Sequence, residues 1–101
     1  MRTFSDLAEA VRFLAGVLET GLDRGSLAEA CREPLPPEWV LDRLREQAAV
    51  TPLVRLYAGW EFPPAAREFK LGGHASELGH IHIDFVRSDA GWQIQRIWMC
   101  R

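Results

Sequence analysis

The chain of 101 residues has little of the residue types on which many specialised small proteins depend. It holds two cysteines, Cys31 and Cys100, which lie far apart and belong to no Cys-x-x-Cys pair. Their spacing excludes a zinc knuckle and a thioredoxin-like motif, and two distant thiols are typical of small, reduced side chains inside cells. We therefore expect a cytoplasmic protein.

Long hydrophobic runs and runs of one charge are also missing. Charged residues interrupt the N-terminal segment, so we expect neither a secretory signal nor a membrane-spanning helix, and no membrane partner. The net charge is −2, from 14 acidic and 12 basic residues, and the arginines are scattered. Because phosphate binding needs a concentrated positive field, this pattern argues against a nucleic-acid partner. The glycine-rich phosphate loops are absent as well, and we predict no cofactor.

The composition is that of one folded domain, which we assign to residues 1–101. Hydrophobic residues make up 48 % of the chain and charged residues 26 %, as in ordinary globular proteins. A chain of this size buries roughly two-thirds of its unfolded surface, so a core forms without disulfide or metal.

The first half, residues 1–50, is predicted to be helical. Apolar residues recur at the spacing of a helix face in two stretches, with a shorter helical stretch between them. Glycine and proline separate the stretches, because glycine caps a helix and proline ends it. The three predicted helices run from the Thr3–Asp6 capping-box pair to Gly21, from Ser26 to Cys31, and from Pro37 to the residue before Thr51.

The second half, residues 51–101, alternates apolar and polar side chains, which predicts an antiparallel meander of about four strands. Residues 64–72 fit either a strand or a helical turn, and we favour a strand. The predicted strands are residues 54–62, a segment within 64–72, residues 80–87 and residues 92–100. The fold class is therefore α+β, with three helices packed on a curved sheet.

The last predicted hairpin has an apolar and a polar face. Alternation separates Ile81, Ile83 and Phe85 from the polar residues between them. A bulge near Gln95-Arg96 is predicted, because it brings the apolar residues of both strands onto one face. We expect the helices to cover that apolar face, with the reverse arrangement left open. The opposite face collects His80, His82, Asp84, Gln93, Trp98 and Cys100.

Two segments resemble domains of the nuclear transport factor 2-like (cystatin-like cone) superfamily. Gly21-Leu22-Asp23-Arg24-Gly25-Ser26-Leu27 looks like the opening of the second helix in such domains. Residues 84–97, a turn followed by Trp-x-Ile-x-x-Ile, are similar to their last hairpin, although the chain is short for the superfamily. The resemblance implies a sheet bent around helices to form a pocket, and a homodimer formed through the sheet. It implies no single activity, because isomerases, dehydratases, cyclases and non-catalytic binding domains share this fold.

The histidines are candidates for a metal site. His80 and His82 form a His-x-His pair on one strand face, and His74, Asp84 or Glu77 would supply the third ligand. Strand histidines are more often hydrogen-bonded or solvated, so we assign no metal.

His82 and Asp84 are also candidates for acid–base catalysis, because a carboxylate beside an imidazole orients it for proton transfer. The simpler interpretation is a cross-strand ion pair of Asp84 with Arg96. Neither Gly-x-Ser-x-Gly nor a Cys–His signature is present, so no nucleophilic serine or cysteine is predicted. Of the four tryptophans, we expect Trp39, Trp60 and Trp92 in or around the core and Trp98 on the polar face.

The polar face favours a small dimeric binding domain over an enzyme. Its pocket or partner surface is expected to contain His80, His82, Asp84 and Trp98, with Tyr57 on a neighbouring strand, and to bind a small apolar ligand or a protein. Two alternatives stay open. One is an isomerase or dehydratase with Asp84 or His82 as general base, and the other is an inhibitor-like or immunity-like interaction module without a pocket.

Overall fold

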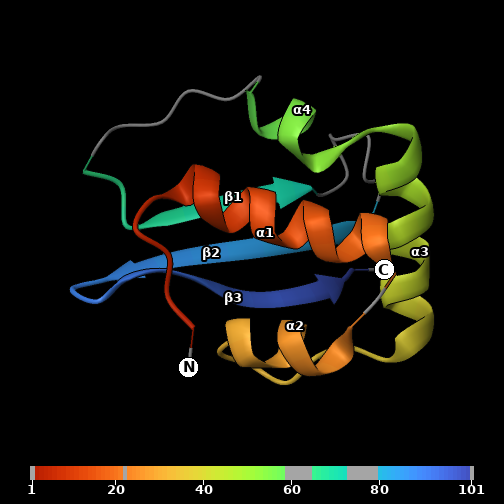
Figure 1. Ribbon diagram of the computed structural model, residues 1–101, viewed down its shortest axis with the longest axis horizontal. Coiled ribbons are helices and arrows are strands. Elements are labelled where there is room, and N and C mark those ends of the chain that lie inside the picture. Colours follow the sequence, from red (N-terminus) through yellow and green to blue (C-terminus); the bar gives the residue numbers. More distant parts are fainter. Residues whose placement is uncertain (1, 22, 59–64, 73–79, 101) are drawn as a thin grey trace.

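In the part of the chain that the structure describes, four helices lie against a three-stranded antiparallel sheet of strand order β1-β2-β3 (Figure 1). This computed structural model describes residues 2–21, 23–58, 65–72 and 80–100. The helices are α1 (Leu7–Thr20), α2 (Arg24–Ala30), α3 (Glu38–Val50) and α4 (Leu53–Ala58), and the strands are β1 (Glu68–Gly72), β2 (Ile81–Ser88) and β3 (Gly91–Met99). Within these ranges, no helix is both long enough and apolar enough to cross a membrane.

The N-cap of helix α1 is Asp6, about one turn after the predicted cap at Thr3. The carboxylate of Asp6 accepts a hydrogen bond of 2.8 Å from the backbone nitrogen of Glu9. Phe4 is held in a β-bridge to Trp92, so the backbone before Asp6 is extended and the helix cannot start there. Helix α2, by contrast, starts earlier than predicted, because Asp23 caps it.

Helix α4 occupies residues for which the alternating pattern predicted a strand, and that prediction is wrong. The carbonyl of Pro52 accepts two backbone hydrogen bonds, of 3.0 and 3.1 Å, from the first turn. Leu53 is buried, and Leu56 and Tyr57 pack partly against the core at the i, i+3, i+4 spacing of a helix. The helical part of the chain therefore extends beyond the predicted boundary at residue 50. Residues 59–62 of that predicted strand lie outside the described part.

The sheet has the predicted division into two faces. Asp84 pairs with Arg96 and Phe85 pairs with Ile94, so Gln95 is the extra residue of a bulge. This bulge was predicted at Gln95-Arg96 and is confirmed, as is the strand within residues 64–72. The apolar residues Phe85 and Ile94 are at most 1 % exposed and belong to one core cluster with all four helices. The helices cover the apolar face, as expected.

Two segments from the helical half are bound to the outer edge of β3. Phe4 and Trp92 exchange two backbone hydrogen bonds of 2.8 Å, and the backbone nitrogen of Glu33 donates to the carbonyl of Gln95 at 3.0 Å. Gln93, expected on the polar face, is only 7 % exposed, and its amide donates to the carbonyl of Arg2 at 3.5 Å. This edge pairing places Glu33 beside the polar face.

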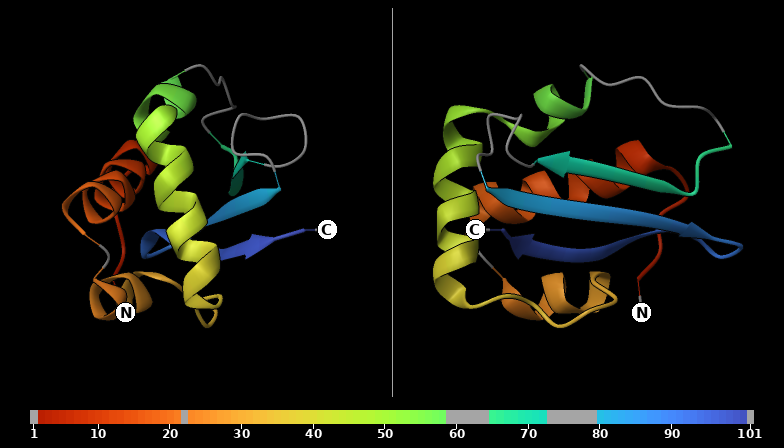
Figure 2. Two further views of the ribbon diagram at one scale, coloured as in Figure 1. Left: turned by 90° about the vertical axis from the view of Figure 1, so that its right-hand side faces the viewer. Right: turned by 180° about the vertical axis from the view of Figure 1, so that it is seen from behind.

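The other side of the sheet carries no described helix or strand. In the left-hand view of Figure 2, α1, α2 and α4 lie to one side of the strands, and no described helix lies on the opposite side of β2 and β3. We call this side the outer face. It carries Lys70, His82, Asp84, Arg96 and Trp98.

Candidate functional site on the outer face of the sheet

Strand register brings the predicted polar residues together. His82 lies opposite Trp98, and Asp84 lies opposite Arg96 on one side and Lys70 on the other. Directly opposed residues on one sheet face have Cβ atoms about 5 Å apart, so their side chains interact. The sequence period therefore placed His82, Asp84 and Trp98 on the same face correctly.

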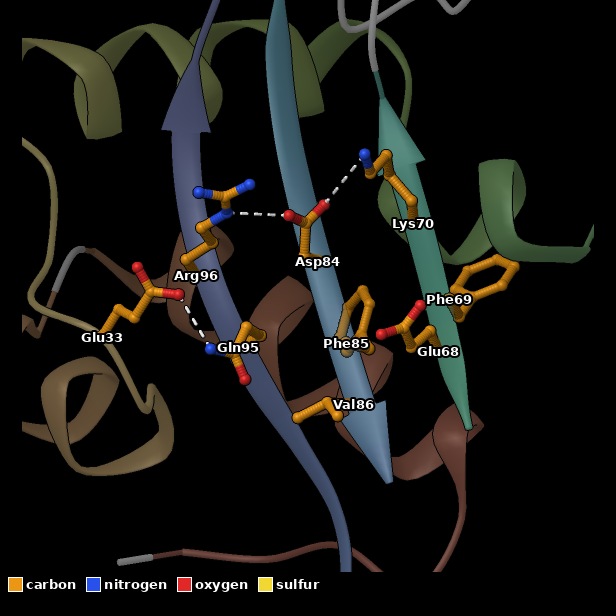
Figure 3. Close-up of a pocket in the computed structure, with 9 residues that line it drawn as sticks. All are labelled: Glu33, Glu68, Phe69, Lys70, Asp84, Phe85, Val86, Gln95 and Arg96. Atoms are coloured by element: carbon orange, nitrogen blue, oxygen red, sulfur yellow. Dashed lines mark hydrogen bonds and ion pairs between the residues drawn. The ribbon is translucent and has the colours of Figure 1, made fainter. Parts of the chain in front are cut away.

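Asp84 is the centre of a charged network (Figure 3). Its Oδ2 atom accepts hydrogen bonds from Arg96 Nε at 2.9 Å and from Trp98 Nε1 at 3.0 Å. Lys70 Nζ lies 3.9 Å from Oδ1. The side chain of Asp84 is 15 % exposed, whereas those of Lys70 and Arg96 are 54 % and 43 % exposed. The predicted cross-strand ion pair of Asp84 with Arg96 is confirmed. One mostly buried carboxylate therefore lies between two more exposed cations.

Trp98 is fixed by contacts with its neighbours on this face. The His82 ring stacks on it with centroids 4.1 Å apart and an interplanar angle of 12°. The guanidinium of Arg96 lies 4.6 Å from the indole centroid, and Lys70 Nζ lies 5.7 Å from it. Cations at these distances are attracted to the negative face of the indole. Trp98 is half-buried.

A shallow hollow of about 610 Å³ lies over the middle of the outer face. Glu33 reaches it from the segment bound to β3, where its carboxylate accepts a hydrogen bond of 2.8 Å from the amide of Gln95 (Figure 3). The hollow mixes acids and bases. Its charged lining residues are Glu33, Glu68, Asp84, Lys70 and Arg96. Sequence reasoning missed Lys70, whose place depends on the strand register, and Glu33, whose place depends on its backbone hydrogen bond to the edge of β3.

Other predicted site residues lie elsewhere. Tyr57 is on α4 and meets Phe69 edge-on at 5.8 Å on the helix-covered side, because residues 53–58 are helical. It is therefore not brought together with the other candidates. His74 and the proposed third ligand Glu77 lie outside the described residues. Within the described ranges, no three or more of the histidines, cysteines, aspartates and glutamates are grouped as metal ligands.

A second depression, of about 440 Å³, lies where the start of α3 meets the ends of β2 and β3. We call it the groove. Trp39 was expected in or around the core but is 58 % exposed here. It lies in the first turn of α3, whose N-cap residue is Pro37. The groove is lined by Pro36, Pro37, Trp39, Val40, His80, Trp98, Met99 and Cys100.

Cys100 contacts His82 at the end of the hairpin. Sγ of Cys100 lies 3.0 Å from Nε2 of His82, and the backbone nitrogen of Cys100 donates to the carbonyl of His80 at 2.9 Å. The sequence placed both residues on the polar face. It gave no signal for their contact, because they lie 18 positions apart and the bulge at Gln95 decides which residues align.

Comparison of the chain with models of known families, with curated proteins and with solved structures gives no match to any of them. The resemblance to nuclear transport factor 2-like domains therefore stays a prediction. The α+β architecture is compatible with it.

Proposed function

We propose that the chain is a non-catalytic binding domain that forms a homodimer through the outer face of its sheet. The observation that carries this proposal is the ordered network around Asp84 and Trp98 on a face that no described element covers. Half-buried aromatic and arginine side chains are the residue types that anchor protein interfaces. The resemblance to a superfamily that pairs through its sheets supports the same assignment.

The charges of the outer face favour a second copy as the partner. A two-fold interface brings each patch against the same patch of the other copy, so the patch must complement itself. This face has cations on β1 and β3, Lys70 and Arg96, and acids beside them, Glu33 and Glu68. Antiparallel docking of two such faces sets cations of one copy against acids of the other.

The same geometry argues against the enzyme alternative. A general base needs a carboxylate or imidazole that faces the substrate within an enclosed site. Asp84 already accepts two hydrogen bonds and lies beside two cations, and the hollow above it is partly open to solvent. An isomerase or dehydratase with Asp84 or His82 as base is therefore the less favoured function. A small apolar ligand fits the charged hollow less well than a protein surface does.

Sedimentation equilibrium over a wide range of concentrations tests the proposal. We expect the parent chain to be a dimer, and Lys70→Glu to raise the dissociation constant at least about tenfold, which is about 1.4 kcal/mol. Arg43→Glu, an exposed change on α3 away from the sheet, is the matched control and leaves the constant unchanged. A parent chain that stays monomeric at every concentration contradicts self-association. In that case the interaction module with a different partner becomes the better assignment.

A further inference from the structure

The contact of Cys100 with His82 joins a nucleophilic atom to a proton acceptor at the rim of the groove. The 3.0 Å between Sγ and Nε2 lies in the range over which nucleophile and base exchange a proton. Cys100 is half-buried, and His82 is 9 % exposed. Cys100 is one of the residues that line the groove, so a small molecule bound there lies beside it.

We propose that Cys100 is a nucleophilic thiol, with His82 as its general base, that undergoes exchange with small neutral aromatic disulfides bound in the groove. This proposal does not rest on self-association, because the groove lies at the end of the hairpin beside α3 rather than over the middle of the outer face.

The exchange reaction balances without any further reagent. Sγ of Cys100 attacks one sulfur of the disulfide, and a new S–S bond forms as the old one breaks. The thiol proton passes to Nε2 of His82 and then to the departing thiolate, which leaves as a thiol. Cys100 ends as a mixed disulfide, so it is oxidised, and the released half of the reagent is reduced.

Trp98 suits His82 to this role. The stacked rings hold the imidazole in one orientation, with Nε2 toward the sulfur. They also stabilise the imidazolium that forms as the proton arrives, because a cation is attracted to an indole face. Among the described residues, the charged and titratable groups around the pair are Asp84 and Arg96, which are paired with each other, Lys70 over the Trp98 ring, and exposed His80 on the groove.

The lining of the groove selects the class of disulfide. Two prolines and the exposed Trp39 face Trp98 and Met99 across it, so its walls are mainly apolar and aromatic. Flat apolar rings bind more favourably to such walls because they stack on them. Binding of a charged aliphatic disulfide is less favourable, because its charged groups lose hydration there. A neutral aromatic disulfide is therefore expected to react faster than oxidised glutathione.

Cys31 provides an internal control within the same chain. It is 4 % exposed in the core, and burial raises the pKa of its thiol to about 12. A thiol in this environment is unreactive in the folded protein.

The test measures the rate at which each thiol reacts with dithiodipyridine at neutral pH, followed by the absorbance of the released thione and by peptide mapping. We expect Cys100 to react first, and His82→Phe, which keeps a ring for Trp98 to stack on, to slow it at least about tenfold. Cys31→Ala is expected to leave the rate at Cys100 unchanged. A His82→Phe rate equal to that of the parent overturns the proposal, as does labelling of Cys31 as fast as that of Cys100.

Two further measurements keep the proposal testable if His82→Phe does not fold. In the parent, Cys100 is expected to react at least about tenfold faster in the native chain than in urea, since only the fold supplies the base. A native rate below the unfolded rate overturns the proposal. Trp39→Ala is expected to slow dithiodipyridine several-fold and to leave iodoacetamide unaffected. Equal slowing of both reagents contradicts binding of the aromatic disulfide in the groove.

Discussion

Asp84 is the single residue on which the outer face depends most. Its carboxylate joins all three strands, through Lys70 on β1, its own place on β2, and Arg96 and Trp98 on β3. It is the least exposed member of its ion pairs, so its loss leaves half-exposed cations that water can solvate and an indole N–H without its acceptor. The cost of removing it is therefore moderate.

We predict that Asp84→Ala lowers the free energy of unfolding by about 1 to 2 kcal/mol in urea titrations, because exposed partners are screened by solvent. The difference from the parent is expected to shrink in about 1 M salt, since salt weakens the ionic share of the network. Asp42→Ala, an exposed change on α3, is the control and shifts stability by no more than about 0.5 kcal/mol. An Asp84→Ala variant as stable as the parent refutes this role.

For single residues, the alternation of the sequence predicts the sheet face on which a side chain lies. It does not predict most of the contacts between particular residues of neighbouring strands. Alternation and the predicted bulge put His82, Asp84 and Trp98 on one face, and the ion pair of Asp84 with Arg96 was predicted as the simpler interpretation of the carboxylate. The contact of Cys100 with His82 and the approach of Lys70 depend on the exact register between neighbouring strands. Alternation assigns a residue to a face, but it does not say which residue of the next strand lies opposite.

Among the elements, α4 shows how a short segment can satisfy two periods at once. Apolar residues in a six-residue stretch fit the alternation of a strand and the i, i+3, i+4 pattern of a helix equally well. Pro52 decides between them, because its carbonyl begins the first helical turn. Tyr57 consequently packs on Phe69 on the core side instead of reaching the outer face. Longer elements, such as α1 and β2, show one period clearly and were predicted.

The start of α1 gives a prediction at the same scale. Asp6 satisfies the backbone nitrogen of Glu9, which otherwise has no partner in the first turn. We predict that Asp6→Ala costs about 1 kcal/mol of unfolding free energy, measured from the denaturation midpoint. Asp6→Asn keeps an oxygen that accepts the hydrogen bond, so we expect it to lower the free energy of unfolding by only a few tenths of the loss in Asp6→Ala. Equal losses in the two variants would show that the cap is not the cause.

The N-terminal segment connects the helical half of the molecule to the last hairpin through a β-bridge. Phe4 is 1 % exposed and packs against the ring of Phe13 on α1 at a tilt. It exchanges two backbone hydrogen bonds with Trp92 on β3. The helical half is thus tied to the edge of the sheet by residues at opposite ends of the chain. Gly91 permits this approach, since its φ is +125° and a Cβ there would lie 2.6 Å from the carbonyl oxygen of Phe4.

Gly91→Ala is therefore expected to weaken the β-bridge between Phe4 and Trp92. Strain from the positive φ and the clash with the Phe4 carbonyl together predict a loss of about 2 kcal/mol or more of unfolding free energy. The amide protons of Phe4 and Trp92 are expected to exchange faster with deuterium in the variant, because both bonds of the bridge are strained. Gly16→Ala, in α1 with no heavy atom within 4 Å of the added methyl, is the matched control and is expected to stabilise the chain by up to about 1 kcal/mol. If both variants gain stability, and the Phe4 amide keeps its protection, then the N-terminal segment does not close the fold in the way its hydrogen bonds indicate.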